Sequence, residues 1–199
     1  ACTRTQASVG ILTGFVVVAT MLYAVSFVRI YKGPHPWVTI SEWIYRNVPA
    51  GSTIANEHWD DGLPLGLRVD GRGRSFDEYK HVEMKNYEDD NAAKVQMLVE
   101  NIQKADYIVL ATNRLYGSTA RLAERYPITK RYYELLFAEK LGFTLVQVST
   151  LYPRLFGVAI VDETMSDPRL PKPALLASYK PAPVVISLGK ADESFTVYD

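Results

Sequence analysis

The most prominent feature of the hydrophobic pattern is an apolar run at residues 7–28 that contains no charged side chain. As a helix, a run of this length would extend roughly 30 Å, which matches the hydrocarbon core of a bilayer. Tyr23, Arg29, Tyr31 and Lys32 near its C-terminal end are typical of a membrane–water interface. We therefore predict an N-terminal tail and transmembrane helix over 1–32. A cleaved signal peptide fits less well, because the run is long and no clear cleavage site precedes RIYK.

Two glycines in this run are spaced four residues apart, at Gly10 and Gly14. Small residues at this spacing allow two membrane helices to approach closely. We therefore predict that Gly10 and Gly14 lie on a helix-packing face. The partners expected on this basis are membrane lipid and other transmembrane helices or subunits of a membrane complex.

The pattern changes after the Gly/Pro hinge at 32–37, where short apolar segments begin to alternate with turns. Ser41 is the predicted N-cap of a short helix that Pro49 and Gly51 end. We predict strands at 53–56, 79–87 and 105–112, with 62–78 as a loop. Apolar residues at helical spacing predict a helix between the last two strands: Val95, Leu98, Val99 and Ile102.

The second half of the chain continues this alternation. We predict one short helix ending at Pro127 and a longer one capped by Thr129 and ended by Gly142. Strands follow at 143–150 and 157–162, then a proline-rich extended connection at 167–183, and a last strand within 193–199. Strands alternating with helices indicate α/β architecture. Residues 33–199 are therefore predicted to form a small three-layer α/β domain with a mostly parallel sheet.

Composition and charge exclude several functions. The 22 basic and 22 acidic residues leave no net charge, so there is no electrostatic footprint for nucleic acid. Cys2 is the single cysteine, which excludes an internal disulfide and a thiolate metal cage. No Ser/His/Asp or Cys/His set can be assembled. We predict no cofactor, no metal and no catalytic residue.

The densest cluster of chemically capable side chains is EHWDD at 57–61, just after a predicted strand. Ligands of open α/β sheets bind beyond strand carboxyl ends, so Glu57, His58, Asp60 and Asp61 are candidates for contact with a ligand or partner. An alternative interpretation is that these residues bind a divalent cation, as in a metal-dependent hydrolase. However, adjacent residues of an extended chain point in opposite directions. The structural alternative is a loop whose aspartates bind backbone amides, with Trp59 on the core.

A second candidate is ATNRLYGS at 111–118, which follows the clearest strand and opens a helix. Asn113, Arg114 and Tyr116, with Ser118, could hold an anion or a sugar there. The structural alternative is ordinary capping by Asn113 or Ser118, with Arg114 packed along the sheet edge.

Three phrases of the sequence resemble a known family: WIYRNVPAGSTIANEHWDDGLP, ADYIVLATNRLYGSTARLAERYPITKRYYELLFAEKLGF and ADESFTVYD. They are similar to the C-terminal extracytoplasmic region of family 39, dolichyl-phosphate-mannose protein mannosyltransferase-like membrane glycosyltransferases of green filamentous bacteria and relatives. The resemblance covers about residues 40–162 and 191–199. It implies transfer of a sugar from a polyprenyl-phosphate donor, with the catalytic acid in an early loop between membrane helices that this chain lacks.

This resemblance sets the functional expectations. We expect a non-catalytic, membrane-anchored domain of a glycosyltransferase-like protein, serving recognition or docking, with residues 33–199 on the extracytoplasmic side. A glycan or polyprenyl-phosphate sugar would be reached through a part of the parent outside this chain. The alternative is a processed single-pass accessory subunit of a larger membrane complex, such as a photosynthetic or electron-transfer assembly.

Overall fold

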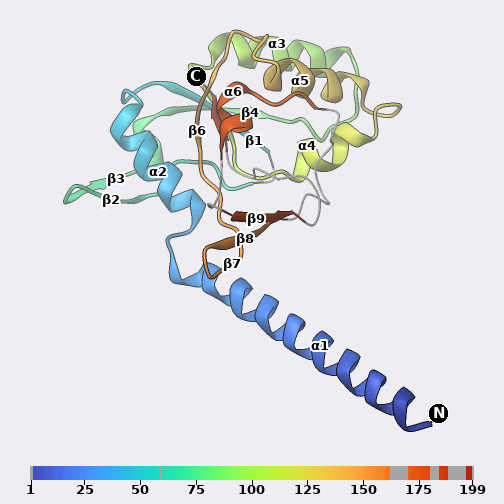
Figure 1. Cartoon of the computed structure of the whole chain (residues 1–199). Coiled ribbons are helices and arrows are strands. Elements are labelled where there is room, and N and C mark those ends of the chain that lie inside the picture. The colour runs from blue at the N-terminus through green and yellow to red at the C-terminus, as the bar shows by residue number, and fades with distance from the viewer. Residues whose placement is uncertain (1, 59, 162–169, 180–183, 188–195, 199) are drawn as a thin grey trace.

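The computed structural model describes residues 2–58, 60–161, 170–179, 184–187 and 196–198. Its first element is the long helix α1 (Cys2–Val28), followed by a 3-10 turn, η1 (Arg29–Lys32). Figure 1 shows α1 projecting away from a folded domain that contains the other elements. The predicted span 7–28 lies within α1, and this helix is long and apolar enough to cross a membrane.

The domain begins with α2 (Pro36–Asn47), which starts five residues before the predicted cap at Ser41. Its N-cap is His35, whose Nδ1 accepts a hydrogen bond from the Trp37 amide at 3.2 Å. Proline at the first helical position fits this start, because its missing N–H would have no partner there. Ser41 is instead buried, and its hydroxyl accepts a hydrogen bond from the Leu65 amide at 2.8 Å.

The central sheet has five strands in the order β4-β1-β5-β10-β6. The strands β1 (Thr53–Glu57), β4 (Lys80–Met84) and β5 (Tyr107–Leu110) pair in parallel. The short strand β10 (Thr196–Tyr198) lies antiparallel between β5 and β6 (Leu145–Val148). Parallel strands place their carboxyl ends at one edge, so the ends of β1, β4 and β5 lie together.

Helices cover both faces of this sheet, as the alternating pattern predicts. Ile54 and Val109 belong to a buried cluster with residues of α2. Ala55 and Ile108 belong to the cluster formed with α3 (Ala92–Lys104) and α5 (Pro127–Phe137). The three-layer α/β prediction with a mostly parallel sheet is confirmed.

The segment 62–78, predicted as a loop, contains a hairpin. Strands β2 (Leu67–Val69) and β3 (Arg72–Arg74) pair antiparallel, and η2 (Phe76–Glu78) follows them. Both turn residues have positive φ, +50° at Asp70 and +80° at Gly71. Asp-Gly is a preferred pair for such a turn, so the local chemistry explains a hairpin that the weak periodicity concealed.

The remaining elements lie largely where the sequence predicts them. After α4 (Arg114–Ser118) and η3 (Thr119–Arg121), α5 begins at Pro127 and not at Thr129. The helix ends at Phe137, before Gly142, and the chain turns at Glu139 with φ +56°. The predicted strand at 157–162 corresponds to β8 (Val158–Val161), which pairs with β7 (Arg154–Leu155) and β9 (Val184–Ser187).

The predicted extended connection 167–183 is only partly described, because 167–169 and 180–183 lie outside the described residues. Its described part is not wholly extended. It contains the short helix α6 (Ala174–Ser178), with Leu176 buried against the core shared with α5.

Candidate functional site

The candidate site is a crevice at the carboxyl edge of the parallel strands. It has a volume of about 240 Å³. The residues that line it come from the end of β1, the loop that follows, η2 and β4: Asn56, Glu57, Asp60, Gly62, Phe76, His81, Val82 and Glu83. This is the edge at which open α/β sheets bind ligands.

Glu57 is the last residue of β1 and is only 3% exposed. Its Oε1 accepts a hydrogen bond from the Tyr133 hydroxyl and another from Asn86 Nδ2 at 3.1 Å. Its Oε2 is buried and has no hydrogen-bond partner among the described residues. Burial raises the pKa of Glu57 to about 7, although both hydrogen bonds oppose the shift. The Asp60 charge raises this pKa further, so Glu57 can change protonation state near neutral pH.

Asp60 joins the two motifs that the sequence singled out. Its side chain is 4% exposed. One oxygen accepts a hydrogen bond from the Thr112 hydroxyl at 2.6 Å, and the other lies 3.6 Å from a guanidinium nitrogen of Arg114. Because the Arg114 side chain is 61% exposed, it also presents positive charge to solvent at this edge.

His58 and Asp61 do not join this cluster. The Nδ1 atom of His58 bonds to the carboxylate of Glu83, and its ring stacks on Tyr87 with 4.9 Å between centroids. Asp61 is exposed, and Trp59 lies outside the described residues. Within the described chain, no group of three or more His, Cys, Asp or Glu side chains is arranged to hold a metal ion. The EHWDD motif therefore does not form one cluster. Glu57 is buried, His58 pairs with Glu83, and Asp60 lies beside Arg114.

The rest of the second motif has mixed placement. Asn113 occupies the N-cap position of α4, but its side chain makes no cap hydrogen bond. Ser118 donates its hydroxyl hydrogen bond to the Arg114 carbonyl. Tyr116 is buried, and its ring packs edge-on against Phe137 with 5.2 Å between centroids. From this motif, Thr112 and Arg114 contact Asp60.

Sequence reasoning missed the residues that hold Glu57. Tyr133 has the helical spacing of a core residue and is fully buried, but its hydroxyl also donates a hydrogen bond to Glu57. Asn86 follows β4 and is fully buried. The predicted strand 79–87 included Asn86, whereas β4 ends at Met84, so only the structure places Asn86 just beyond a strand's carboxyl end.

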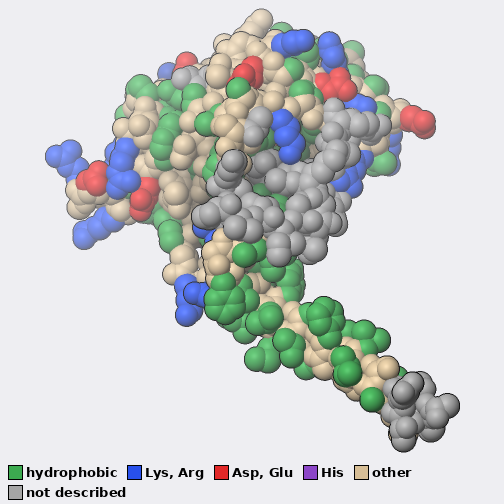
Figure 2. All heavy atoms as spheres, in the orientation of Figure 1, with side chains coloured by type: hydrophobic (Ala, Val, Ile, Leu, Met, Phe, Trp, Pro, Cys, Tyr) green, Lys and Arg blue, Asp and Glu red, His purple; other side chains and the backbone are tan. Residues whose placement is uncertain are grey.

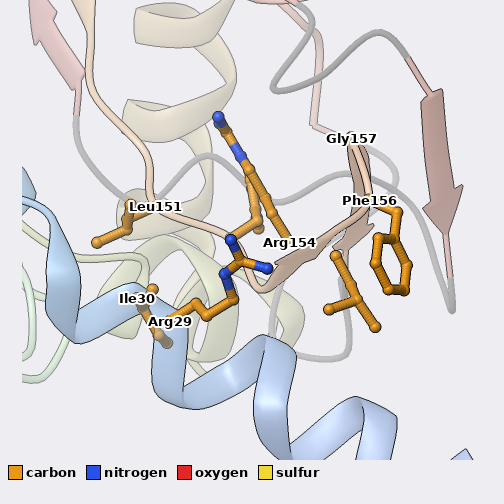
Figure 3. Close-up of a pocket in the computed structure, with 8 residues that line it drawn as sticks. Arg29, Ile30, Leu151, Arg154, Phe156 and Gly157 are labelled. Atoms are coloured by element: carbon orange, nitrogen blue, oxygen red, sulfur yellow. The ribbon is translucent and has the colours of Figure 1, made fainter.

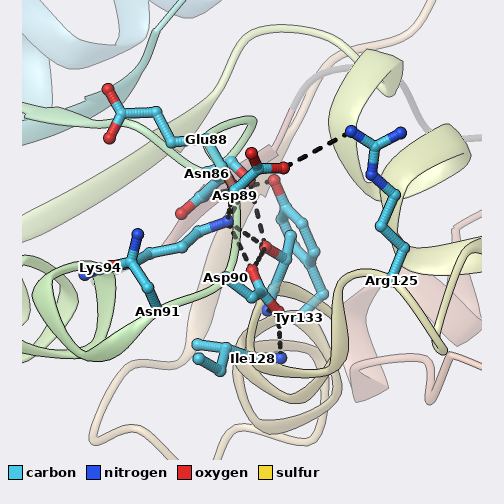
Figure 4. Close-up of polar contacts among 10 residues, drawn as sticks. Asn86, Glu88, Asp89, Asp90, Asn91, Lys94, Arg125, Ile128 and Tyr133 are labelled. Carbon is cyan, nitrogen blue, oxygen red and sulfur yellow. Dashed lines mark hydrogen bonds and ion pairs between the residues drawn. The ribbon is translucent and has the colours of Figure 1, made fainter.

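A second buried polar network holds Asn86 in place (Figure 4). The Lys94 ammonium, on α3, donates hydrogen bonds to the Asn86 carbonyl at 2.8 Å and to the Asp90 carboxylate at 2.8 Å. Asp90 also accepts hydrogen bonds from the Ile128 and Thr129 amides at the start of α5. Burial alone would raise the pKa of Asp90, but its bonds to Lys94 and Thr129 hold it below the ordinary value. This network joins α3 and α5 to the end of β4.

Two further surfaces lie away from the crevice. An apolar groove of about 400 Å³ runs between α3 and α5, and Val95 and Val99 within it are 43% and 48% exposed. A cavity of about 500 Å³ lies where η1 meets the β7–β8 hairpin (Figure 3).

On α1, Gly10 and Gly14 are exposed with no described atom near the position of a Cβ, so that face is open for helix packing.

No family model matches this chain, and neither a curated protein nor a solved structure matches it.

Proposed function

We propose that this chain is a membrane-anchored recognition domain of a glycosyltransferase-like protein, and that its carboxyl groups accept hydrogen bonds from a partner without the chain catalysing transfer itself. The observation that carries the proposal is the crevice at the sheet edge, with the buried Glu57 carboxyl group at its wall. The resemblance to family 39 adds the expected side: residues 33–199 outside the cytoplasm.

The anchor in this proposal is α1. Its large apolar side chains are exposed along its length, with Ile11 at 75% and Phe15 at 70%. Figure 2 shows these side chains along the helix up to its junction with the domain. Such a surface is unfavourable in water and suits a bilayer. The turn η1 and residues 33–35 connect it to α2, whose Ile40 and Ile44 are in the domain core.

The chemistry of the crevice selects the ligand class. Three carboxyl side chains line it, Glu57, Asp60 and Glu83, and Glu57 offers a buried acceptor oxygen that no described residue uses. Groups that donate hydrogen bonds complement such acceptors. The hydroxyls of a glycan are the donors that a glycosyltransferase-like parent would present. The volume of about 240 Å³ suits a single small group more than an extended polymer.

Binding of oligosaccharides to the full chain in detergent micelles tests this proposal. Titration calorimetry should show saturable binding that Asp60→Asn weakens, because one charge-assisted acceptor is lost; the expected change is about tenfold. Asp61→Asn is the matched control, since Asp61 is exposed and does not line the crevice. Equal binding by all three proteins, or none by wild type across mannose-, glucose- and galactose-containing oligosaccharides, would contradict it.

A second candidate function is that of a single-pass accessory subunit of a larger membrane complex, for example a photosynthetic or electron-transfer assembly. The apolar groove between α3 and α5 favours it, because exposed apolar surface of this kind is typical of a protein interface. Native gel electrophoresis of mildly solubilised membranes tests it. Val99→Asp should release the chain from a larger assembly, whereas Gln96→Asp, on an exposed position of the same helix, should not.

A further inference from the structure

The cavity at the foot of the domain is lined by both apolar and cationic side chains (Figure 3). Arg29 and Ile30 belong to η1, immediately after the apolar helix. Arg154 and Leu155 form β7, and Phe156 and Gly157 form the turn that leads to β8. The two segments are far apart in sequence, but each supplies one arginine to the same cavity.

The hairpin lies at the depth where the apolar helix ends. Strand β7 contacts α1, and Ser26 in the last turns of α1 is completely buried. The Ser26 hydroxyl donates a hydrogen bond to the Tyr23 carbonyl at 2.7 Å, so its polar group is satisfied within the helix. If α1 spans a bilayer, the β7–β8 turn therefore meets the membrane at the level of the lipid headgroups.

The charges of this cavity are uncompensated within the described chain. Neither Arg29 nor Arg154 forms an ion pair with an acidic residue that the structure describes. Guanidinium groups bind phosphate oxygens through paired hydrogen bonds. Two such groups beside apolar walls fit an anion that carries a hydrophobic portion.

The turn residue Phe156 is unusual in two respects. Its side chain is 88% exposed, and its φ is +50°, a conformation that glycine and asparagine adopt more readily than an aromatic residue. Neither packing within the described chain nor turn chemistry accounts for an aromatic residue here. Insertion among lipid chains at the membrane surface accounts for both its exposure and its place beside the arginines.

We propose that Arg29 and Arg154 bind the headgroup phosphate of an anionic glycerophospholipid in the leaflet next to the domain, while Phe156 inserts into that leaflet. This inference rests on the proposed membrane anchoring by α1, but it does not depend on the ligand of the sheet-edge crevice. The bound lipid would hold the domain at a fixed tilt relative to the membrane.

Native mass spectrometry of the full chain in detergent, titrated with phosphatidylglycerol, tests the phosphate site. Each juxtamembrane arginine contributes about 1 kcal/mol toward an anionic lipid, so Arg29→Gln and Arg154→Gln should each weaken binding about fivefold. Arg154→Lys should retain most of the affinity because it keeps the charge. Arg72→Gln, in the exposed part of the β2–β3 hairpin, is the matched control and should bind as wild type does.

Two comparisons identify the source of the phosphate. Phosphatidylglycerol should bind more tightly than phosphatidylcholine, and inorganic phosphate at the same concentration should not compete. Equal affinity for both lipids, full competition by inorganic phosphate, or equal losses in the Arg72→Gln control would each overturn the proposal.

A spin label reports the depth of the turn. The label is placed by Phe156→Cys in a Cys2→Ser background, in vesicles of phosphatidylcholine and phosphatidylglycerol. Oxygen should relax it more than a water-soluble nickel chelate does; the opposite result would overturn the insertion. Failure of anchoring is distinguishable, because alkaline extraction would then release the wild-type chain. Release would remove the basis of this inference together with the proposed function, whereas a retained chain without lipid preference would remove this inference alone.

Discussion

The Tyr133 hydroxyl on α5 donates a hydrogen bond to the carboxyl group of Glu57 at the end of β1. Both side chains are buried, and the Asn86 amide donates to the same carboxyl oxygen. The bond links a helix of one layer to the sheet edge where the candidate crevice opens. Because the Glu57 carboxyl group is buried, its protonation state affects the stability of the fold.

The first prediction concerns the pH dependence of folding. The pKa of Glu57 is about 7 when folded and 4.5 in its ordinary state, so the folded chain binds this proton more tightly. As pH rises from about 4.5 to 7, the unfolded chain releases the proton first, and the free energy of unfolding falls. The contribution is fully present below pH 4.5 and lost above pH 7, by roughly 3 kcal/mol in total.

Glu57→Gln should remove this contribution, because glutamine stays neutral at every pH. Chemical unfolding of the full chain in detergent should show the variant gaining stability relative to wild type between pH 5 and pH 8. Asp61→Asn serves as the control at an exposed position. A constant difference between Glu57→Gln and wild type across this range would contradict the prediction.

The second prediction concerns the wall of the crevice. A Cβ added at Gly62 would lie 2.7 Å from Cε2 of Phe76, whose ring stacks on His81. Gly62→Ala should therefore displace this ring and destabilise the domain by about 1–3 kcal/mol, as overpacking does. Gly66→Ala is the control, because its nearest neighbour is a carbonyl oxygen at an ordinary 3.8 Å. Thermal unfolding compares them; equal melting temperatures would show that the ring moves freely.

The sequence was sufficient to predict the layers of the fold, because periodicity records which face of each element is buried. Val95 and Leu98 already indicate the helix that covers the sheet, and Ile108 the central strand. The hairpin at 67–74 was missed, because its information lies in one Asp-Gly turn and not in an alternating pattern.

The sequence was sufficient to locate the candidate site but not to predict which of its residues contact one another. The position of Glu57 after a strand was readable, but its pairing with Tyr133 joins residues 76 positions apart. Tertiary packing alone brings those groups together. Likewise, the separation of His58 from Glu57 follows from strand alternation, whereas the association of Asp60 with Thr112 depends on how two loops meet at the sheet edge.

The third prediction concerns the buried pair of Lys94 and Asp90, whose side chains are 1% and 4% exposed. Lys94→Met should leave the Asp90 charge buried without its cation and destabilise the full chain by about 3–5 kcal/mol. Lys104→Met on the same helix should change stability little, because that side chain is 60% exposed. Chemical unfolding in detergent measures both.

A double variant separates the lost charge pair from lost packing. Asp90→Asn added to Lys94→Met removes the uncompensated charge, so it should recover part of the lost stability. Additive losses in the double variant would mean that the two side chains act independently, contrary to their 2.8 Å contact.

The fourth prediction tests the anchor. Val17 and Val18 lie near the middle of α1 and are 59% and 56% exposed. Replacing both with arginine should oppose membrane insertion by about 6 kcal/mol, since each arginine at a helix centre costs about 3 kcal/mol. The fraction of the chain that resists alkaline extraction from membranes should therefore fall sharply. The control variant Gln6→Arg with Ser8→Arg adds the same charge near the N-terminal end of α1, where a long side chain can reach the membrane interface. Most of this variant should stay in the membrane. Equal extraction of both double variants would show that charge position along α1 is immaterial, which a spanning helix does not allow.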